Sequence, residues 1–203
     1  TWDDQEDQDG KRPESITVRL YADGIEIDEK VVSESSDWQY TFTNLPKNAQ
    51  GEAIKYTVVE DQIAEYQATY EGSMITNSHT PEKRNLVVNK VWSDNNDQDG
   101  IRPEQVVVKL VANGKATNET ITLNESNNWQ GNFTDLAVYE NKKEITYTVE
   151  EEAVTGYEST ISGSAATAYT ITNSHTPETT EVGGTKTWDD QEDQDGKRPE
   201  SIT

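Results

Sequence analysis

The chain contains one stretch of sequence twice. Residues 1–17 recur letter for letter as residues 187–203, which gives a repeating unit of 186 residues. A weaker repeat divides that unit into halves at an offset of 90 residues, where four residues match four others: Trp2, Gly10, Arg12 and Pro13 match Trp92, Gly100, Arg102 and Pro103. Repetition on this scale is typical of arrays in which each unit folds by itself and contacts its neighbours. The chain must therefore fold as tandem domains rather than around one large core.

The two halves also match in their middles and at their ends. Trp38, Phe42, Leu45, Tyr56, Glu60 and Tyr66 recur 91 positions later as Trp129, Phe133, Leu136, Tyr147, Glu151 and Tyr157, and the run 76–82 recurs as 172–178. The pattern predicts domains at residues 1–82 and 83–178, followed by a linker and the first strand of a third repeat at 179–203. The connectors 79–85 and 175–184 are short and carry proline, so we expect limited swivelling.

The second domain shows the clearer secondary-structure signal. Short runs of alternating apolar and polar residues are separated by turn residues such as Asn113-Gly114, and Asp23-Gly24 marks a similar turn in the first domain. Seven strands are predicted, at residues 86–92, 105–112, 117–123, 129–135, 144–151, 157–161 and 168–174. No helical period competes with this pattern. The predicted fold class is all-β, with each domain an antiparallel sandwich.

The composition limits both the core and the partners. Leucine, isoleucine, valine and phenylalanine make up 36 of 203 residues, cysteine is absent and the net charge is −22. Such a thin core has no disulfide to support it, and thiol catalysis is excluded. The negative charge disfavours nucleic acid and anionic membranes as partners. No run is apolar enough for membrane insertion, and the chain opens in mid-pattern without a leader, like a fragment of a longer protein.

Three predicted strands each carry one polar side chain near the end of an otherwise apolar face. By strand alternation Lys90, Glu151 and Asn173 lie on the apolar faces of the first, fifth and last strands. Two interpretations remain open from the pattern alone. The groups face water, as charged residues usually do, or they are buried together and satisfy one another. In the second case the Lys90 amine could attack the Asn173 side-chain amide, with Glu151 carrying the proton.

The acidic loops, residues 3–10 and 93–100, faintly resemble a calcium loop. Aligned on the final glycine, however, the twelfth position of the second loop is Val106, where a bidentate glutamate belongs. We expect solvated loops between strands, with calcium binding as the alternative. His79 and His175 have no second histidine or cysteine nearby, so we expect linker residues rather than metal ligands. No metal site and no cofactor are predicted, and no nucleophile-elbow motif supports hydrolysis.

Three ordered motifs, present in both halves, are shared with a known family. They are Lys-x-Trp-(Asp/Ser)-Asp followed by Gln-Asp-Gly-x-Arg-Pro, then Tyr-Thr-Val-x-Glu, then Ile-Thr-Asn-Ser-His-Thr-Pro, the lysine of the first half falling before Thr1. The chain resembles the Cna protein B-type domain, the stalk repeat of collagen-adhesin-like surface proteins of Gram-positive bacteria. The resemblance implies tandem inverse immunoglobulin-like (prealbumin-like) β-sandwiches, each with a spontaneous Lys–Asn isopeptide bond promoted by a Glu or Asp.

The resemblance also assigns roles to residues of the second domain. Carried over position by position, it makes Lys90 the nucleophile, Asn173 the acceptor and Glu151 the catalytic acid. Burial would lower the pKa of Lys90 and so leave an amine able to attack. The reaction would occur once per domain, as maturation, so the protein is not expected to be an enzyme.

The first domain departs from the family pattern. Its matching residues are Asn77 and Glu60, but its lysine would fall one residue before Thr1, so the domain as given cannot close its own bond. Lys186 belongs to the third repeat. It could in principle serve Asn77 of a neighbouring molecule.

Two functions compete. The first is a stalk, extracellular and anchored to the cell wall outside this chain, in which neighbouring repeats contact each other and lift a separate ligand-binding region. The alternative is a repeat module that itself binds a host extracellular-matrix or other protein through exposed aromatics such as Trp38, Tyr66, Trp129 or Tyr157. Because these aromatics have counterparts in both halves, we expect them to pack in cores. A large exposed apolar patch would favour binding instead.

Overall fold

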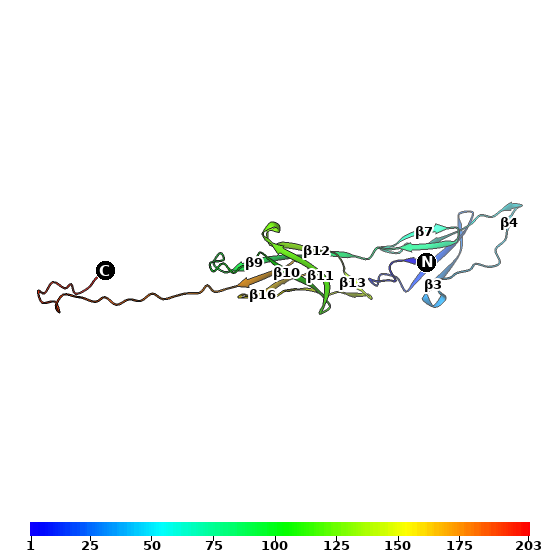
Figure 1. Ribbon diagram of the computed structural model, residues 1–203. Helices are drawn as coiled ribbons and strands as arrows, with labels where there is room; N and C mark the ends of the chain where they lie inside the picture. The colour runs from blue at the N-terminus through cyan, green and yellow to red at the C-terminus, as the bar shows by residue number, and fades with distance from the viewer.

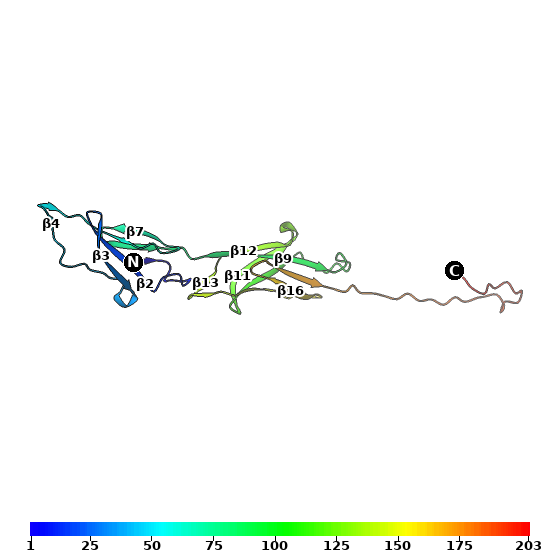
Figure 2. The same ribbon diagram turned by 180° about the vertical axis from the view of Figure 1, so that it is seen from behind.

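The computed structural model describes all 203 residues and shows two β-rich units in a row, followed by an extended segment (Figure 1). The first sandwich is formed by residues 1–78 and the second by residues 83–174, and no strand or helix follows Ser174. Seen from behind, the same linear order is evident (Figure 2). The helices are two short 3₁₀ turns, η1 (Glu34–Ser36) and η2 (Glu125–Asn127). None is long and apolar enough to cross a membrane.

The second sandwich contains all seven predicted strands. Its elements are β9 (Lys83–Ser93), β10 (Gln105–Ala112), β11 (Lys115–Asn124), β12 (Gln130–Ala137), β13 (Tyr139–Glu140), β14 (Lys143–Glu144), β15 (Tyr147–Glu151), β16 (Glu158–Ser164) and β17 (Ala168–Ser174). The strand predicted at 144–151 is divided into β14 and β15, because β14 turns back to pair with β13. One sheet has the order β12-β9-β17-β16 and the other the order β11-β10-β15.

The core of the second sandwich follows from strand alternation. Leu86 and Val88 of β9 point inward and are fully buried, whereas Val87 and Val91 of the same strand are exposed on the outer face. Thirteen buried apolar residues from both sheets form one cluster. The core therefore lies between the two sheets, as in a sandwich.

One prediction about this sandwich is wrong in part. The pairing is not wholly antiparallel, because β9 and β17, the first and last strands, run parallel with Lys90 opposite Ile171 and Asn173 opposite Trp92. A parallel pair requires a long crossover connection. Here the whole of the other sheet lies between the two strands in sequence. The chain therefore enters and leaves the sandwich through two adjacent strands.

The first sandwich has the same plan with fewer strands in its sheets. Its elements are β1 (Trp2–Asp3), β2 (Ser15–Ala22), β3 (Ile25–Ser33), β4 (Asn48–Ala49), β5 (Glu52–Ala53), β6 (Tyr56–Glu60), β7 (Gln67–Glu71) and β8 (Met74–Ser78). The sheet orders are β1-β8-β7, β3-β2-β6 and β4-β5. Residues 39–47, which include the counterpart of most of β12, belong to no strand. The buried cluster contains only Val18, Val32 and Ile75.

The predicted hairpin turns are confirmed. Asp23 and Gly24 connect β2 to β3 with φ angles of 49° and 86°, and Asn113 and Gly114 connect β10 to β11 with φ angles of 50° and 76°. Two consecutive positive φ angles define the tight turn that matches the twist of paired strands, and glycine and asparagine adopt them readily.

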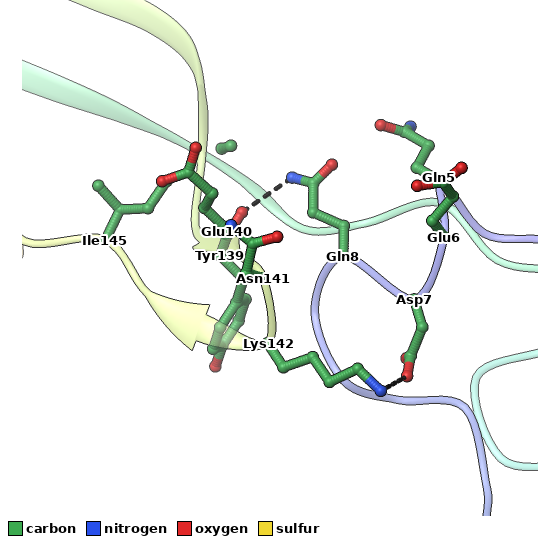
Figure 3. A pocket seen from close by; sticks show the side chains of 10 residues that line it. Gln5, Glu6, Asp7, Gln8, Tyr139, Glu140, Asn141, Lys142 and Ile145 are labelled. Atoms are coloured by element: carbon green, nitrogen blue, oxygen red, sulfur yellow. Dashed lines mark hydrogen bonds and ion pairs between the residues drawn. The ribbon is translucent and has the colours of Figure 1, made fainter.

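The two sandwiches touch where the acidic loop of the first meets the β13–β14 hairpin of the second (Figure 3). The Gln8 side-chain amide donates to the Tyr139 carbonyl at 2.8 Å, and the Lys142 amide donates to the Gln8 carbonyl at 2.9 Å. Only residues 79–82 separate β8 from β9. The junction is thus a short linker beside a direct polar contact.

Candidate functional site

The paired strands β9 and β17 place Lys90 and Asn173 on the same inward face. Because Lys90 is opposite Ile171 and Asn173 is opposite Trp92, the two side chains are diagonal neighbours on adjacent strands. Lys90 is 6% exposed and Asn173 is 0% exposed. Of the two interpretations open from the sequence, the structure favours burial of these groups over exposure to water.

Glu151 reaches the same point from the opposite sheet. It ends β15, and its Oε1 atom lies 3.5 Å from Lys90 Nζ, an ion-pair distance longer than an ordinary hydrogen bond. The two side chains are 2% and 0% exposed, respectively. Ser159 on β16 donates its hydroxyl to Glu151 Oε2 at 3.0 Å. The carboxylate is therefore held between the amine and a hydroxyl group.

The surroundings of Lys90 favour the neutral form of its side-chain amine. Burial lowers its pKa to about 8, although the nearby Glu151 carboxylate acts in the other direction. The ammonium lies 4.0 Å from the centre of the Trp92 ring and donates to the Val91 carbonyl at 3.2 Å. A neutral, nucleophilic amine is thus far more accessible here than for a lysine in water.

The Asn173 amide is the unusual member of the group. Neither its Oδ1 nor its Nδ2 atom has a hydrogen-bond partner, although both are buried. Most buried polar atoms are paired, and an unpaired one costs about 1–3 kcal/mol. An unpaired carboxamide beside an amine and an acid is an arrangement that suits acyl transfer rather than simple packing.

The first sandwich also buries an acid and an amide together, without a lysine beside them. Asn77 Nδ2 donates to both oxygens of Glu60, at 2.9 and 3.0 Å, and both residues are buried. Burial raises the pKa of Glu60, opposed by the hydrogen bond from Asn77. Trp2 pairs with Asn77 as Trp92 pairs with Asn173, and the Thr1 ammonium donates to the Ile75 carbonyl at 2.7 Å.

Lys186 keeps the local geometry of Lys90 without the rest of a domain. Its Nζ atom lies 4.0 Å from the centre of the Trp188 ring, the same distance as in the Lys90–Trp92 pair. It is exposed, and the C-terminal segment that follows β17 extends away from both sandwiches (Figure 1). The structure therefore does not bring Lys186 and Asn77 together within one molecule.

The aromatics proposed as binding residues pack within the sandwiches. Trp38 and Tyr66 both contact Trp2 edge to face, with ring centres 4.9 and 5.2 Å apart. Trp129 and Tyr157 contact Trp92 in the same way, at 5.2 and 5.0 Å. Edge-to-face packing of this kind stabilises a core, so these residues have a structural role as expected.

The acidic loops were expected to be solvated, and for Asp4 and Asp94 this is wrong. Asp94 is 3% exposed, and Arg102 donates to both of its oxygens at 2.6 and 2.9 Å. The Arg102 hydrogen bond lowers the pKa of Asp94 to about 2. Tyr157 adds a third bond at 2.9 Å. The aspartate is therefore a fixed anchor of the loop rather than a free ligand, and no cluster of metal-ligating side chains forms.

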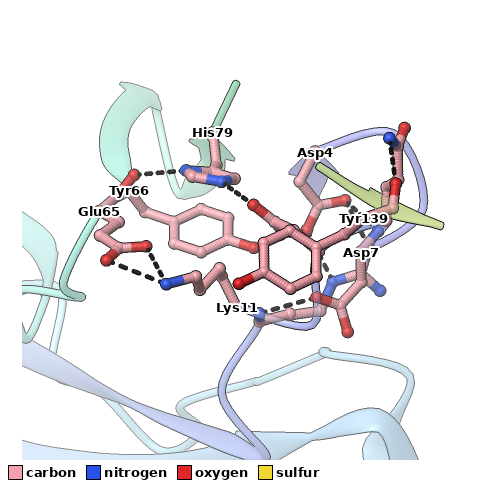
Figure 4. A network of polar contacts seen from close by, with 10 residues as sticks. Asp4, Asp7, Lys11, Glu65, Tyr66, His79 and Tyr139 are labelled. Carbon is pink, nitrogen blue, oxygen red and sulfur yellow. Dashed lines mark hydrogen bonds and ion pairs between the residues drawn. The ribbon is translucent and has the colours of Figure 1, made fainter. Parts of the chain in front are cut away.

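The same anchor in the first sandwich continues into a polar network (Figure 4). Tyr66 donates to Asp4 at 2.9 Å, and His79 contacts Asp9 at 2.7 Å through Nε2 and the Glu65 carbonyl at 2.8 Å through Nδ1. Burial alone would lower the pKa of His79, but the hydrogen bonds to Asp9 and to the Glu65 carbonyl together outweigh it, and the pKa is raised. The histidine lies in the linker between β8 and β9, as expected, and there it also fixes the domain end to the loop.

Some residues of the site were not predicted from the sequence. Ser159, which donates a hydrogen bond to Glu151, lies on β16, where every residue is exposed. It is opposite Asn173, and the residue opposite Asn77 in the first sandwich is Ala68. Ser159 can be recognised as a residue of the site only when the pairing register of β16 and β17 is known.

Two sandwiches follow one another along the chain, and the second buries an amine, an acid and an amide between its sheets, which defines a modular repeat architecture. The chain belongs to the Cna protein B-type domain family, whose profile matches residues 1–78, 86–174 and 182–203.

Named relatives agree with this assignment. The chain is 44% identical over 203 residues to a collagen adhesin of Staphylococcus aureus, a match that covers 100% of this chain and 17% of that protein. The crystal structure of two B repeat units of the collagen binding protein of Staphylococcus aureus is 44% identical and has a TM-score of 0.56, covering 98% of this chain and 54% of that one. A single B repeat unit from the same organism is 42% identical, with a TM-score of 0.46, covering 87% of this chain and 95% of that one.

Proposed function

We propose that the chain is a stalk segment of a bacterial surface adhesin, in which an isopeptide bond joins the first and last strands of each sandwich. The observation that carries the proposal is the joint burial of Lys90, Glu151 and Asn173, with the Asn173 amide unpaired. Similarity to a collagen adhesin supports an extracellular, cell-wall-anchored location. The domains would span residues 1–82 and 83–178, with a third repeat beginning within 179–203, and a region outside this chain would bind the ligand.

The chemistry is an acyl transfer within one domain. The neutral Lys90 amine attacks the Asn173 side-chain carbonyl carbon, a bond from Nζ to Cγ forms, and the bond from Cγ to Nδ2 breaks. Glu151 takes the proton released by the amine and delivers it to the departing nitrogen, so that one ammonia leaves. Fixing the amine beside the amide contributes up to about 7–11 kcal/mol of barrier lowering in ideal cases.

The position of the bond explains its use. It would join residues 90 and 173 and so close a loop of 83 residues. By analogy with a disulfide, a loop of this length stabilises the fold by roughly 4–5 kcal/mol. That is large beside the ~5–15 kcal/mol of an ordinary domain. Load that enters through β9 and leaves through β17 would also pass through a covalent bond between adjacent strands.

Intact mass tests the proposal directly. The folded chain is expected to weigh one ammonia less than its sequence requires, and Lys90→Ala, Glu151→Ala and Asn173→Ala should each restore the full mass. Lys109→Ala is the matched control, because Lys109 is an exposed lysine paired with Glu152, and it should keep the deficit. Full mass in the folded wild-type chain would remove the proposal.

For the first sandwich we propose that Asn77 and Glu60 complete the same bond with a lysine from another strand. Lys186 of a second copy can supply it, because residues 187–203, which follow Lys186 directly, repeat residues 1–17. The buried Asn77–Glu60 pair and the matching Lys186–Trp188 geometry support this. Covalent oligomers should then form at high concentration and disappear in Lys186→Ala or Asn77→Ala. An unmodified Asn77 and a free Lys186 in concentrated, folded protein would contradict it.

A further inference from the structure

The contact between the sandwiches centres on one lysine. Lys142 lies at the tip of the β13–β14 hairpin, and its Nζ atom is 2.5 Å from Asp7 Oδ2 in the acidic loop of the first sandwich (Figure 3). The Asp7 side chain is only 6% exposed. A buried carboxylate needs a cation or several hydrogen bonds, and Lys142 supplies the cation.

Lys142 has a backbone conformation that suits glycine. Asn141 and Lys142 have φ angles of 51° and 65°, the geometry of a two-residue hairpin turn that favours glycine at its second position. The counterpart turn of the first sandwich is Gln50-Gly51, with a glycine there at φ 89°. A non-glycine residue in this region costs of order 1 kcal/mol. The contact with Asp7 gives a physical reason for a lysine at that position.

The acidic loop of the second sandwich provides an internal comparison. In both loops the aspartate Oδ1 accepts from the arginine backbone five positions later, at 2.9 Å. No hairpin lies against the second loop, so Asp97 is partly exposed where Asp7 is buried. A Cβ added at Gly10 would lie 3.1 Å from Lys142 Cβ, whereas one at Gly100 would meet open space. The loop is therefore already shaped without a partner, and the hairpin is what covers it.

We propose that the acidic loop is a socket for a lysine at the hairpin tip of the following sandwich, and that this contact holds the pair at a fixed angle. The partner is a sandwich like that of residues 83–174, which carries a lysine at the tip of its β13–β14 hairpin. The hairpin of the first type, residues 48–53, has no basic residue and does not fit the same socket. Joints in such an array therefore differ: lysine-bearing hairpins make stiff joints, and glycine-bearing hairpins make compliant ones.

The short linker makes a fixed angle possible but does not by itself impose one. His79 is bound to Asp9, Pro81 is buried, and the Val138 amide donates to the Glu82 carbonyl at 3.0 Å. Domains joined by a small, polar interface move relative to each other by default. Stiffness here therefore depends on the few contacts that Lys142 and Gln8 make.

Distance measurements between two spin labels test the proposal on the whole chain. The chain has no cysteine, so Val31→Cys and Ile161→Cys, at positions 66% and 44% exposed, give one label in each sandwich. With Lys142 present, pulsed electron paramagnetic resonance should give one narrow distance distribution. Lys142→Asn should broaden it roughly twofold or more, as expected for domains without a holding contact.

Lys143→Asn is the matched control. It removes the neighbouring lysine of the same hairpin, which makes no ion pair with Asp7, and the narrow distribution should remain. Asparagine tolerates a positive φ better than lysine, so broadening in Lys142→Asn cannot be attributed to a damaged turn. Asp7→Asn should reproduce the broadening. A broad distribution in the wild-type chain, or equal widths for Lys142→Asn and Lys143→Asn, would overturn the proposal.

Discussion

The two sandwiches share a plan and differ at two strand positions. In the second, β9 is an eleven-residue strand paired on both sides, and thirteen apolar residues form the buried cluster. In the first, the corresponding strand is β1, two residues long, and the cluster has three residues. The residues that would pair with its other side, 39–47, leave the sheet. In the second sandwich β9 holds the sheet together, because it pairs with the last strand, β17, on one side and with β12 on the other.

Local structure does not depend on that strand. The bidentate contact of Arg12 with Asp4 has the same distances as that of Arg102 with Asp94, and Arg198 makes it with Asp190 in a segment that has no domain around it. Short-range hydrogen bonds fix the loop, whereas the core needs long-range strand pairing. The comparison thus separates what the repeat motif determines by itself from what only a complete sandwich provides.

The largest expected effect concerns the relative stability of the two sandwiches. With the proposed bond closed, the second sandwich should resist heat and protease better than the first. The cross-link alone should raise its free energy of unfolding by roughly 4–5 kcal/mol. Lys90→Ala should remove most of that difference, and Lys109→Ala should not. Limited proteolysis with mass spectrometry of the fragments measures both. Equal resistance of the two wild-type sandwiches would show that the first strand and its bond matter less than we infer.

Some of this difference could be predicted from the sequence, and some could not. The strands of the second sandwich are visible because Leu86, Val88 and their equivalents alternate with polar or outward-facing residues. The parallel pairing of β9 with β17 is not visible, because it joins residues far apart in sequence and depends on the whole sandwich. The triad was predicted as a set of residues, but only the register shows that Lys90 and Asn173 are diagonal neighbours.

The acidic loops show a different limit. Composition predicts solvated aspartates, and Asp94 is instead buried because Arg102 and Tyr157 satisfy its oxygens. The arginine lies eight positions away and the tyrosine more than sixty, so the second partner is invisible to a local pattern. Lys142 is likewise unremarkable in sequence and gains its significance from a neighbouring domain.

A matched pair of core substitutions sharpens the comparison. Leu110 and Leu20 are counterparts, and both are almost fully buried. Leu110 lies in the large cluster, so Leu110→Ala should cost about 2–5 kcal/mol. Leu20 borders a cavity of about 770 Å³ lined also by Tyr40 and Phe42, so Leu20→Ala should cost less, since little packing is lost. Denaturant unfolding of each variant gives the two values. A larger cost for Leu20→Ala would mean that the first core is better packed than its strands indicate.

The rate of cross-linking should depend on pH in the second sandwich only. Only the unprotonated amine attacks, and burial lowers the pKa of Lys90 to about 8. The rate should therefore rise about tenfold per pH unit below pH 8 and level off above it. Chemically synthesised chain, which has never folded and so carries no bond, is refolded at several pH values and sampled over time by intact mass to give the profile. A flat profile between pH 6 and 8 would contradict attack by a lysine with this pKa.

The smallest effect concerns the histidines that fasten each domain end. Hydrogen bonds to Asp99 and Asp9 raise the pKa values of His175 and His79, the latter against an opposing effect of burial. A raised pKa means that the charged histidine stabilises the fold below its unfolded value of about 6.5, and that this stabilisation is lost as pH rises through the folded value. His79→Gln should lower the melting temperature more at pH 6 than at pH 8.

The same change at His175 should have a weaker effect, since the Asp99 carboxylate is 21% exposed and Asp9 only 1%. The difference arises from the joint, because the hairpin of the second sandwich covers the loop that carries Asp9 and no hairpin covers the loop that carries Asp99. Lys142→Asn should therefore bring the pH response of His79 closer to that of His175. If melting curves show the two histidines responding alike in the wild-type chain, burial at the joint does not strengthen the contact between His79 and Asp9.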